Sequence, residues 1–448
     1  MSAARPQSPR KSLNDRIMGA SLRGLNWLAG SAAIDRLGLR KVTEKMVFSG
    51  VKGGFQLATA SARAFKAVSK LGQPARLPKA GDSGLFDLTL SDEQQMLRDT
   101  VQQFASEQLR PAAQKADHDC AATPELLKGA SDLGIHLMGI PEALGGAGSE
   151  RSAMTNVLVA EAMGHGDLGL AVACLAPSAV STALTLWGDE EQQALYLPAF
   201  AGDNAPVAAL AITEPRALFN PFALQTRARQ VGDGYVLDGL KSLVPRAAQA
   251  EIFIVAAALE GKGPALFIVE SSAQGIRIEA EPAMGLRAAS TARLSFSGVK
   301  LPASALLAAA SADIYAECIA LSRLAWCALA TGCSQAALDY MIPYVNERVA
   351  FGEPISHRQA VAFAISNMAI ETDGMRLLTW RAASRAEQGK SFIQETALAR
   401  RLCADKSILI GSDAVQLLGG HGFIKEHPAE RWYRDLRAVG LMEGVVLV

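Results

Sequence analysis

Near its carboxyl end the sequence reads Gln416-Leu417-Leu418-Gly419-Gly420-His421-Gly422-Phe423, followed by Arg434-Asp435 and then by Glu443-Gly444. Glu443 lies between Met442 and Gly444, with no basic residue beside it in the sequence. Poor solvation raises the pKa of a carboxyl group toward the range that suits a general base. Glu443 is therefore a candidate for removing a proton from carbon. The alternative is a solvated carboxylate near the end of the chain.

Further motifs precede this stretch. They are Ile212-Thr213-Glu214-Pro215, Gly232-Asp233-Gly234-Tyr235 through Lys241, Met284-Gly285 with Ser290-Thr291, and Arg348-x-x-Phe351-Gly352. In order and spacing, the set resembles the acyl-CoA dehydrogenase family over roughly residues 86 to 444. Two segments, Met163–Gly169 and Gly422–Glu426, look most similar to the very-long-chain branch of that family.

Composition predicts a large globular chain without a disulfide framework. The 448 residues allow about three domains, and with 50% hydrophobic and 20% charged residues the chain is neither disordered nor fibrous. The six cysteines form no C-x-x-C pair and the six histidines show no metal-ligand spacing. We therefore predict reduced thiols and no metal site. Nothing in the sequence indicates nucleic-acid binding.

The amino-terminal part carries its own charge. Residues 1–85 hold fifteen Lys and Arg against four Asp and Glu, although the whole chain holds 44 of each. Apolar and basic residues alternate there as in amphipathic helices, which can lie on a membrane surface, pack on protein, or belong to a cleaved transit peptide. No run reaches the ~18 apolar residues of a spanning helix. Peripheral membrane contact through residues 1–72 would place the protein in the cytoplasm at the inner membrane of a bacterium, or otherwise in a mitochondrion.

The periodicity predicts an α+β fold that is mostly α. After the linker at 72–84, helical spacing dominates residues 86–204, short β-rich runs fill 205–312, and long helical patterns return over 313–448. The predicted strands are Tyr235–Leu237, Ile252–Val255, Leu266–Val269, Ile276–Ile278 and Leu294–Phe296. The resemblance implies an amino-terminal helical domain, a middle antiparallel β domain and a carboxyl-terminal four-helix bundle.

The resemblance also implies a reaction. FAD would lie between the β domain and the carboxyl-terminal helices, with part of its site supplied by a second subunit of a homodimer or larger assembly. Glu443 would remove the α-proton of a long-chain acyl-CoA while the β-hydrogen leaves to the flavin as hydride, giving a trans-2-enoyl-CoA. Electron-transfer flavoprotein would then reoxidise the FAD. An acyl-CoA oxidase and a non-catalytic relative are the alternatives.

Individual residues match family positions. The matches to FAD contacts are Ile212, Thr213, Leu243, Pro245, Arg348, Phe351, Gln359, Gln416 and Gly420, and the matches to substrate contacts are Phe219, Arg323 and Gly444. A guanidinium at position 348 suits the FAD pyrophosphate. The alternative for either arginine is a charge on a helix surface. For Arg323, a second alternative is a partner for a carboxylate of the bundle.

Three segments depart from the family pattern and predict a divergent FAD site. Arg216-Ala217-Leu218-Phe219-Asn220 replaces G-x-G-S-D, Leu243-Val244-Pro245 replaces W-I-[ST], and Glu443-Gly444-Val445-Val446-Leu447 replaces E-G-T-x-x-Q. Four lost hydrogen bonds at ~0.5–1.5 kcal/mol each would cost about 2–6 kcal/mol. That cost corresponds to a loss of about thirty-fold to ten-thousand-fold in affinity.

Overall fold

The computed structural model describes residues 89–138, 140–146, 152–202 and 204–446. The chain divides into two compact units, Met1–Leu85 and Phe86–Val448. The predicted basic extension and its linker, residues 1–85, lie outside the described residues, so their proposed membrane contact stays a prediction. All that follows concerns the second unit.

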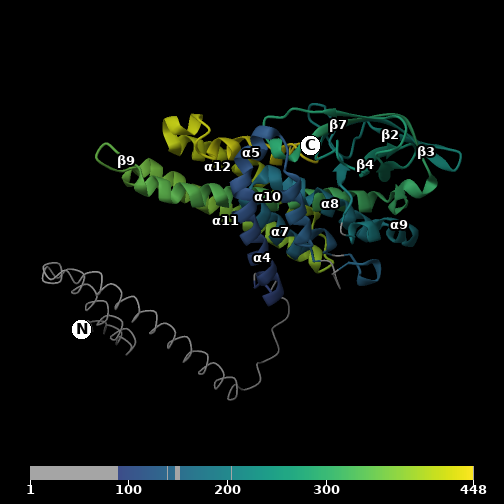
Figure 1. The fold of residues 1–448 in the computed structure, drawn as a ribbon, viewed down its shortest axis with the longest axis horizontal. Helices are drawn as coiled ribbons and strands as arrows, with labels where there is room; N and C mark the ends of the chain where they lie inside the picture. The colour runs from purple at the N-terminus through teal and green to yellow at the C-terminus, as the bar shows by residue number, and fades with distance from the viewer. Residues whose placement is uncertain (1–88, 139, 147–151, 203, 447–448) are drawn as a thin grey trace, which may run out of the picture. The chain divides into compact units, whose positions relative to one another are not determined.

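The amino-terminal part of this unit is helical, as predicted (Figure 1). Its α-helices are α4 (Asp92–Phe104), α5 (Arg110–Asp119), α6 (Pro124–Asp132), α7 (Ala153–Gly166), α8 (Leu168–Trp187) and α9 (Glu190–Phe200), with a π-helical turn η1 (Ala105–Leu109) and 3-10 turns η2 (Ile135–Leu137) and η3 (Glu142–Leu144). A capping box begins α4, because the side chains of Ser91 and Gln94 each accept the other's backbone N–H at 3.1 Å.

The middle part is an eight-stranded sheet with the order β6-β7-β3-β2-β4-β5-β8, while β1 pairs with β4. The strands are β1 (Ala208–Ala211), β2 (Arg227–Val231), β3 (Gly234–Val244), β4 (Ile252–Leu259), β5 (Gly263–Glu270), β6 (Ile276–Ala280), β7 (Ala292–Leu301) and β8 (Leu306–Leu307). Most pairs are antiparallel, as predicted, but β4 runs parallel to both β1 and β2. The sheet is therefore mixed rather than purely antiparallel.

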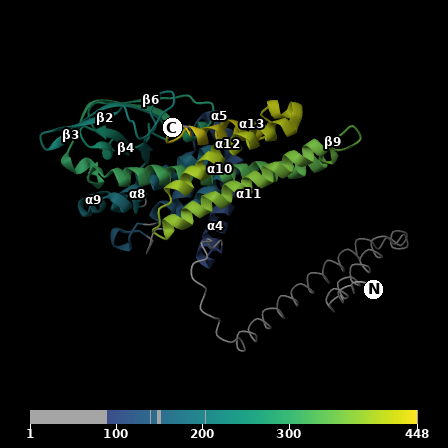
Figure 2. The ribbon, with the colours of Figure 1, turned by 180° about the vertical axis from the view of Figure 1, so that it is seen from behind.

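The carboxyl-terminal part is helical again and lies beside the sheet (Figure 2). Its helices are α10 (Ala312–Glu347), α11 (Gln359–Glu387), α12 (Ile393–Leu418) and the short α13 (Ala429–Asp435), with the hairpin β9 (Val349–Ala350) and β10 (Glu353–Pro354) between α10 and α11. The 3-10 turns of this part are η7 (Ile355–His357), η8 (Gly419–Phe423) and η9 (Leu436–Gly440). The turns η4 (Arg287–Ala289), η5 (Ala303–Ala305) and η6 (Ala308–Ala310) precede α10 and belong to the middle part. The order of helical, β and helical domains is the predicted one.

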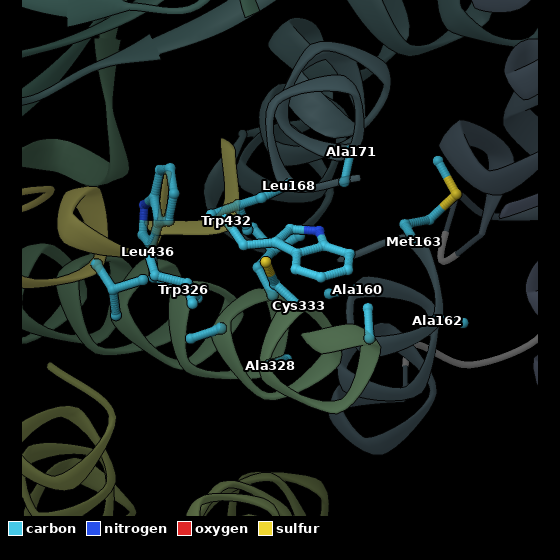
Figure 3. Close-up of a cluster of buried hydrophobic side chains, with 14 of the residues drawn as sticks. Ala160, Ala162, Met163, Leu168, Ala171, Trp326, Ala328, Cys333, Trp432 and Leu436 are labelled. Atoms are coloured by element: carbon cyan, nitrogen blue, oxygen red, sulfur yellow. The ribbon is translucent and has the colours of Figure 1, made fainter. Parts of the chain in front are cut away.

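The core forms where α7, α8 and α10 meet the carboxyl-terminal turns, as Figure 3 shows for Trp326, Trp432 and their neighbours. Glycines allow α7 and α10 to cross closely: a Cβ on Gly332 would lie 1.9 Å from the Glu161 carbonyl oxygen, and one on Gly164 would lie 2.5 Å from that of Leu329. By length and mean hydropathy, α8 and α10 would each suffice to cross a membrane, contrary to the prediction from apolar runs. In both helices 61% of the apolar window is buried in the protein, as in core helices.

The Arg434-Asp435 pair connects all three parts of the unit. The Arg434 guanidinium donates to both carboxylate oxygens of Asp117 on α5, at 2.8 and 2.9 Å. The Asp435 carboxylate accepts the backbone N–H of Leu286, from the loop before β7, at 2.7 Å. This motif therefore holds the stretch before Glu443 against the helical and β domains.

Candidate active site

Glu443 lies just after η9 in a strained turn. Its φ is +52°, in the left-handed region that non-glycine residues rarely adopt, and Gly444 follows with a φ of +97°. A Cβ on Gly444 would lie 2.5 Å from Cδ of Pro221, so both the backbone angle and the available space require glycine there. The Glu443 N–H donates to Oγ1 of Thr213 at 3.3 Å, which ties the turn to the β domain.

The Glu443 side chain is buried, with 5% of the residue exposed. Burial raises the pKa of its carboxyl group; the nearby Arg400 charge opposes this shift, as do hydrogen bonds from Ser322 and Trp326 and the charge of Arg323. Oε2 has no hydrogen-bond partner among the described residues. The prediction of a poorly solvated carboxylate is right, although the fold brings near it two arginines that are remote in sequence.

A cavity of about 220 Å³ adjoins this carboxylate. Its walls come from α7, α8 and α10, with Leu210 and Pro245 contributed by the β domain, and most of the lining is apolar. Small side chains line much of it, including Ala160, Ala176 and Ala179. Such a cavity suits a hydrocarbon chain held with one reactive end beside Glu443.

Two arginines, the half-buried Arg323 and the buried Arg400, hold the main chain of the turn. Arg323 on α10 donates to the Glu443 carbonyl oxygen from Nε at 3.0 Å and from Nη2 at 2.7 Å. Arg400 on α12 donates from Nη2 to the carbonyl oxygens of Met442 and of Gly444, the latter at 3.0 Å. Arg323 is thus neither a surface charge nor the partner of a carboxylate, and sequence reasoning missed Arg400.

The altered loop after Pro215 closes on itself. The Arg216 guanidinium donates to the carbonyl oxygens of Asn220, at 3.2 Å, and of Ala223, and lies 5.5 Å from the centre of the Phe219 ring. Phe219 is buried, and its carbonyl oxygen accepts the Val445 N–H at 3.1 Å. Arg216 therefore braces the loop that covers the Glu443 turn.

The segment predicted to face the flavin ring offers few free donors. The Leu243 N–H donates to the Glu281 carboxylate at 2.7 Å and the Ser242 N–H donates to the Thr213 carbonyl at 2.9 Å. Pro245 has no N–H and lines the cavity, while Ile212 is buried in the core. The Thr213 hydroxyl keeps its own hydrogen to donate. The N–H groups of Ser242 and Leu243 are therefore already paired within the chain, and the divergent FAD site stays a prediction.

The other predicted FAD contacts form a second, exposed group. Arg348, Phe351, Gln359, Gln416 and Gly420 are all exposed and lie at the ends of α10, α11 and α12. Along α10, Arg348 lies ~37 Å from Arg323 at 1.5 Å per residue. Figures 1 and 2 agree that the β9 hairpin protrudes away from the sheet. Charged and exposed groups of this kind suit the pyrophosphate end of FAD. Within one chain, however, they lie far from Glu443.

The same exposed end groups three potential metal ligands that sequence spacing did not indicate. Ligand atoms of His421, Glu426 and His427 lie within 4.8 Å of one another. Nδ1 of His427 is 2.6 Å from the Tyr340 hydroxyl, so one ring nitrogen already has a partner. The absence of a metal site stays a prediction.

With this geometry in view, the comparisons with known proteins identify the class. Three domain models of acyl-CoA dehydrogenases match: the amino-terminal domain over residues 91–203, the middle domain over 209–299 and the carboxyl-terminal domain over 312–446. The chain belongs to the acyl-CoA dehydrogenase family, whose members are flavin-dependent oxidoreductases.

Its relatives include short-chain enzymes. The human mitochondrial short-chain specific acyl-CoA dehydrogenase is 32% identical over 362 residues, covering 79% of this chain and 87% of that protein. The structure of butyryl-CoA dehydrogenase from Megasphaera elsdenii matches with a TM-score of 0.75 and 28% identity, covering 81% of this chain and 97% of that one. A chain from a study of the electron transferring flavoprotein of Acidaminococcus fermentans also gives 0.75, at 29% identity and the same coverage. The prediction that the chain is most similar to the very-long-chain branch was therefore wrong.

Arg400, Ser322 and Trp326 were not predicted from the sequence. Arg400 did leave a signal, because it lies among Thr396, Cys403 and Ser407 on the buried face of α12. An arginine on the apolar side of a helix needs buried acceptors. Ser322 and Trp326 left none, since both are ordinary residues in a long apolar helix.

Proposed function

We propose that the protein catalyses the flavin-dependent α,β-dehydrogenation of a long-chain acyl-CoA, with Glu443 as the base. The observation that carries the proposal is the unpartnered Oε2 of a buried carboxylate beside an apolar cavity. A base whose pKa is raised by burial binds a proton strongly, and burial also excludes the water that would compete for it.

The residues around the carboxylate would orient it. Ser322 and Trp326 hydrogen-bond to it, leaving Oε2 to take the α-proton. FAD, when bound, would accept the hydride from the β-carbon. Thr213 would lie at its ring, and Arg348 with Gly420 of a second copy would meet its pyrophosphate, because one chain holds these groups too far from its own Glu443.

The length of the cavity supports a long acyl chain. Lining residues extend along α8 from Val172 to Trp187, a span of ~22 Å at 1.5 Å per residue. One lipid acyl chain fills about half of a ~30 Å hydrocarbon core, or ~15 Å. The cavity has a volume of about 220 Å³ and a mostly apolar lining, which suits the hydrocarbon part of such a substrate.

A homodimer or larger assembly and an electron-transfer flavoprotein partner complete the proposal. Exposed Phe351 (95%) and Phe423 (91%) lie on the same end as Arg348, and such apolar side chains favour burial against another copy. The likeness to a chain from a study of an electron transferring flavoprotein supports this choice of electron acceptor. A location in the cytoplasm at a membrane, or in a mitochondrion, belongs to the same proposal and depends on residues 1–72.

A non-catalytic relative is the second candidate, favoured by Pro245 and by the occupied N–H groups of Ser242 and Leu243. Turnover of C4 to C20 acyl-CoA substrates separates the two. We expect activity that rises toward C16, loss of activity in Glu443→Gln, and normal activity in the control Glu191→Gln on the surface of α9. An inactive FAD-loaded wild type would favour the second candidate, and an active Glu443→Gln variant would reject Glu443 as the base.

A further inference from the structure

The turn that carries Glu443 has three consecutive carbonyl groups held by two guanidinium groups. Arg323 binds the central carbonyl, that of Glu443, and Arg400 binds the carbonyls on either side, those of Met442 and Gly444. The central residue has a left-handed backbone conformation, which is unfavourable for any residue other than glycine. Such a conformation persists when the surrounding contacts hold it, and these hydrogen bonds do so.

Arg400 is unusual in how little else it contacts. Only 3% of the residue is exposed, and Nε and Nη1 have no hydrogen-bond partner within the described part of the chain. No salt bridge of Arg400 to a carboxylate is among those found for the described residues, and the carboxyl group that interacts electrostatically with it is that of Glu443. A buried charge without a close ion pair is costly, so a purely structural role is a poor explanation for it.

We propose that Arg400 is a positioning residue for the catalytic base, holding the carbonyls on both sides of Glu443 so that its carboxylate faces the cavity in one orientation. The inference rests on the proposed function of Glu443. Planar geometry explains the choice of arginine, because one guanidinium nitrogen can serve two carbonyls while the rest of the group stays fixed in the helix packing.

Arg400 also influences the pKa of the Glu443 carboxyl. The groups that interact electrostatically with Glu443 are Arg400 from α12 and, from α10, Arg323, Tyr315 and Cys318. Burial raises the pKa of the Glu443 carboxyl, and Arg400 is the largest opposing influence. Removing the Arg400 charge should therefore raise that pKa further and move the acid limb of the pH–rate profile to higher pH.

Three variants separate charge from positioning. Arg400→Met removes both, Arg400→Lys keeps the charge without the planar fork, and the control Arg401→Met removes the neighbouring arginine, whose side chain is 59% exposed and pairs with Asp405. For Arg400→Met we expect a fall in kcat on the order of 100-fold, as for a misplaced catalytic group, with the acid limb at higher pH. Arg400→Lys should recover part of the rate with the limb in place, and Arg401→Met should match wild type.

The readouts are the pH dependence of kcat and exchange of the substrate α-proton with deuterium oxide, measured on the FAD-loaded enzyme with circular dichroism as a check of folding. If Arg400→Met does not fold, Arg400→Lys alone decides, through a lower exchange rate at an unchanged acid limb. Wild-type rates and pH profile in the Arg400 variants would overturn the inference, as would equal damage in Arg401→Met. Activity in Glu443→Gln would instead overturn the proposed function.

Discussion

The Glu443 turn and the end of the molecule that carries the β9 hairpin differ in how many of their groups find partners within one chain. At the turn, the three carbonyls from Met442 to Gly444 accept hydrogen bonds from Arg323 and Arg400, and a cavity adjoins the buried carboxylate. At the hairpin end, Arg348 and Phe351 are exposed, and the Arg358 guanidinium lies 5.8 Å from the centre of the Phe351 ring. A single chain thus encloses Glu443, whereas five of the nine predicted FAD contacts are exposed at the other end of the helices.

Subunit complementation tests whether Arg348 of one subunit completes the site that contains Glu443 of another. Homodimers of Glu443→Gln and of Arg348→Met should both be nearly inactive, because each site lacks either the base or a pyrophosphate contact. Co-expressed subunits should recover about one quarter of wild-type turnover, since random pairing makes half of the dimers mixed and one site in each is intact. No recovery in purified mixed dimers would mean that both groups serve the same chain's site.

Cofactor affinity gives the next largest effect. A hydrogen bond to a charged group contributes ~1.5–3 kcal/mol, so Arg348→Met should weaken FAD binding by about ten- to 150-fold. Fluorescence titration of the apoprotein with FAD measures this, and Arg381→Met on α11 is the control. Equal affinities for Arg348→Met and wild type would remove Arg348 from the site.

Filling the cavity at either end should change the substrate profile. Val172→Phe and Ala183→Phe place a ring at opposite ends of the lined stretch of α8. One of them should lower kcat/KM for palmitoyl-CoA by about tenfold or more while sparing butyryl-CoA, and that result identifies the end where the acyl chain terminates. Parallel losses for both substrates in both variants would contradict a long-chain cavity.

The smallest expected effect concerns the tie between the turn and the β domain. Thr213→Val removes the acceptor of the Glu443 N–H with little change in volume, which should cost ~0.5–1.5 kcal/mol of stability. Denaturant unfolding measures the loss. The comparison is Thr372→Val, which alters a buried threonine within α11. An unchanged midpoint would mean that Arg323 and Arg400 hold the turn without Thr213.

The sequence predicted the order of domains because helical and strand periodicities are local. It missed β1 and β2, since Ala208–Ala211 lacks β-branched residues and Arg227–Val231 is largely polar. β1 becomes a strand through its pairing with β4, which is remote in sequence, while β2 pairs antiparallel with β3 over its whole length and parallel with β4 at Arg227 and Ala228. That pairing also made the sheet mixed.

The candidate site divides in the same way. Burial of Glu443 could be predicted from its uncharged neighbours in sequence, but Arg400 lies 43 positions earlier and reaches the turn through the packing of α12. The sequence shows that the loop after Pro215 is altered, whereas the hydrogen bonds of Arg216 to carbonyls of its own loop needed coordinates. Sequence motifs located the candidate base, and tertiary contacts explain how it is held.

If Glu443 removes a proton from a long-chain acyl-CoA as hydride passes to bound flavin, this substrate should reduce the flavin. An anaerobic titration of the FAD-loaded protein with palmitoyl-CoA, followed by visible absorption, measures that reduction. We predict that the flavin band bleaches in wild type and persists in Glu443→Gln, which should still bind FAD. A band that persists in wild type, or that bleaches equally in the variant, would reject Glu443 as the base of this reaction.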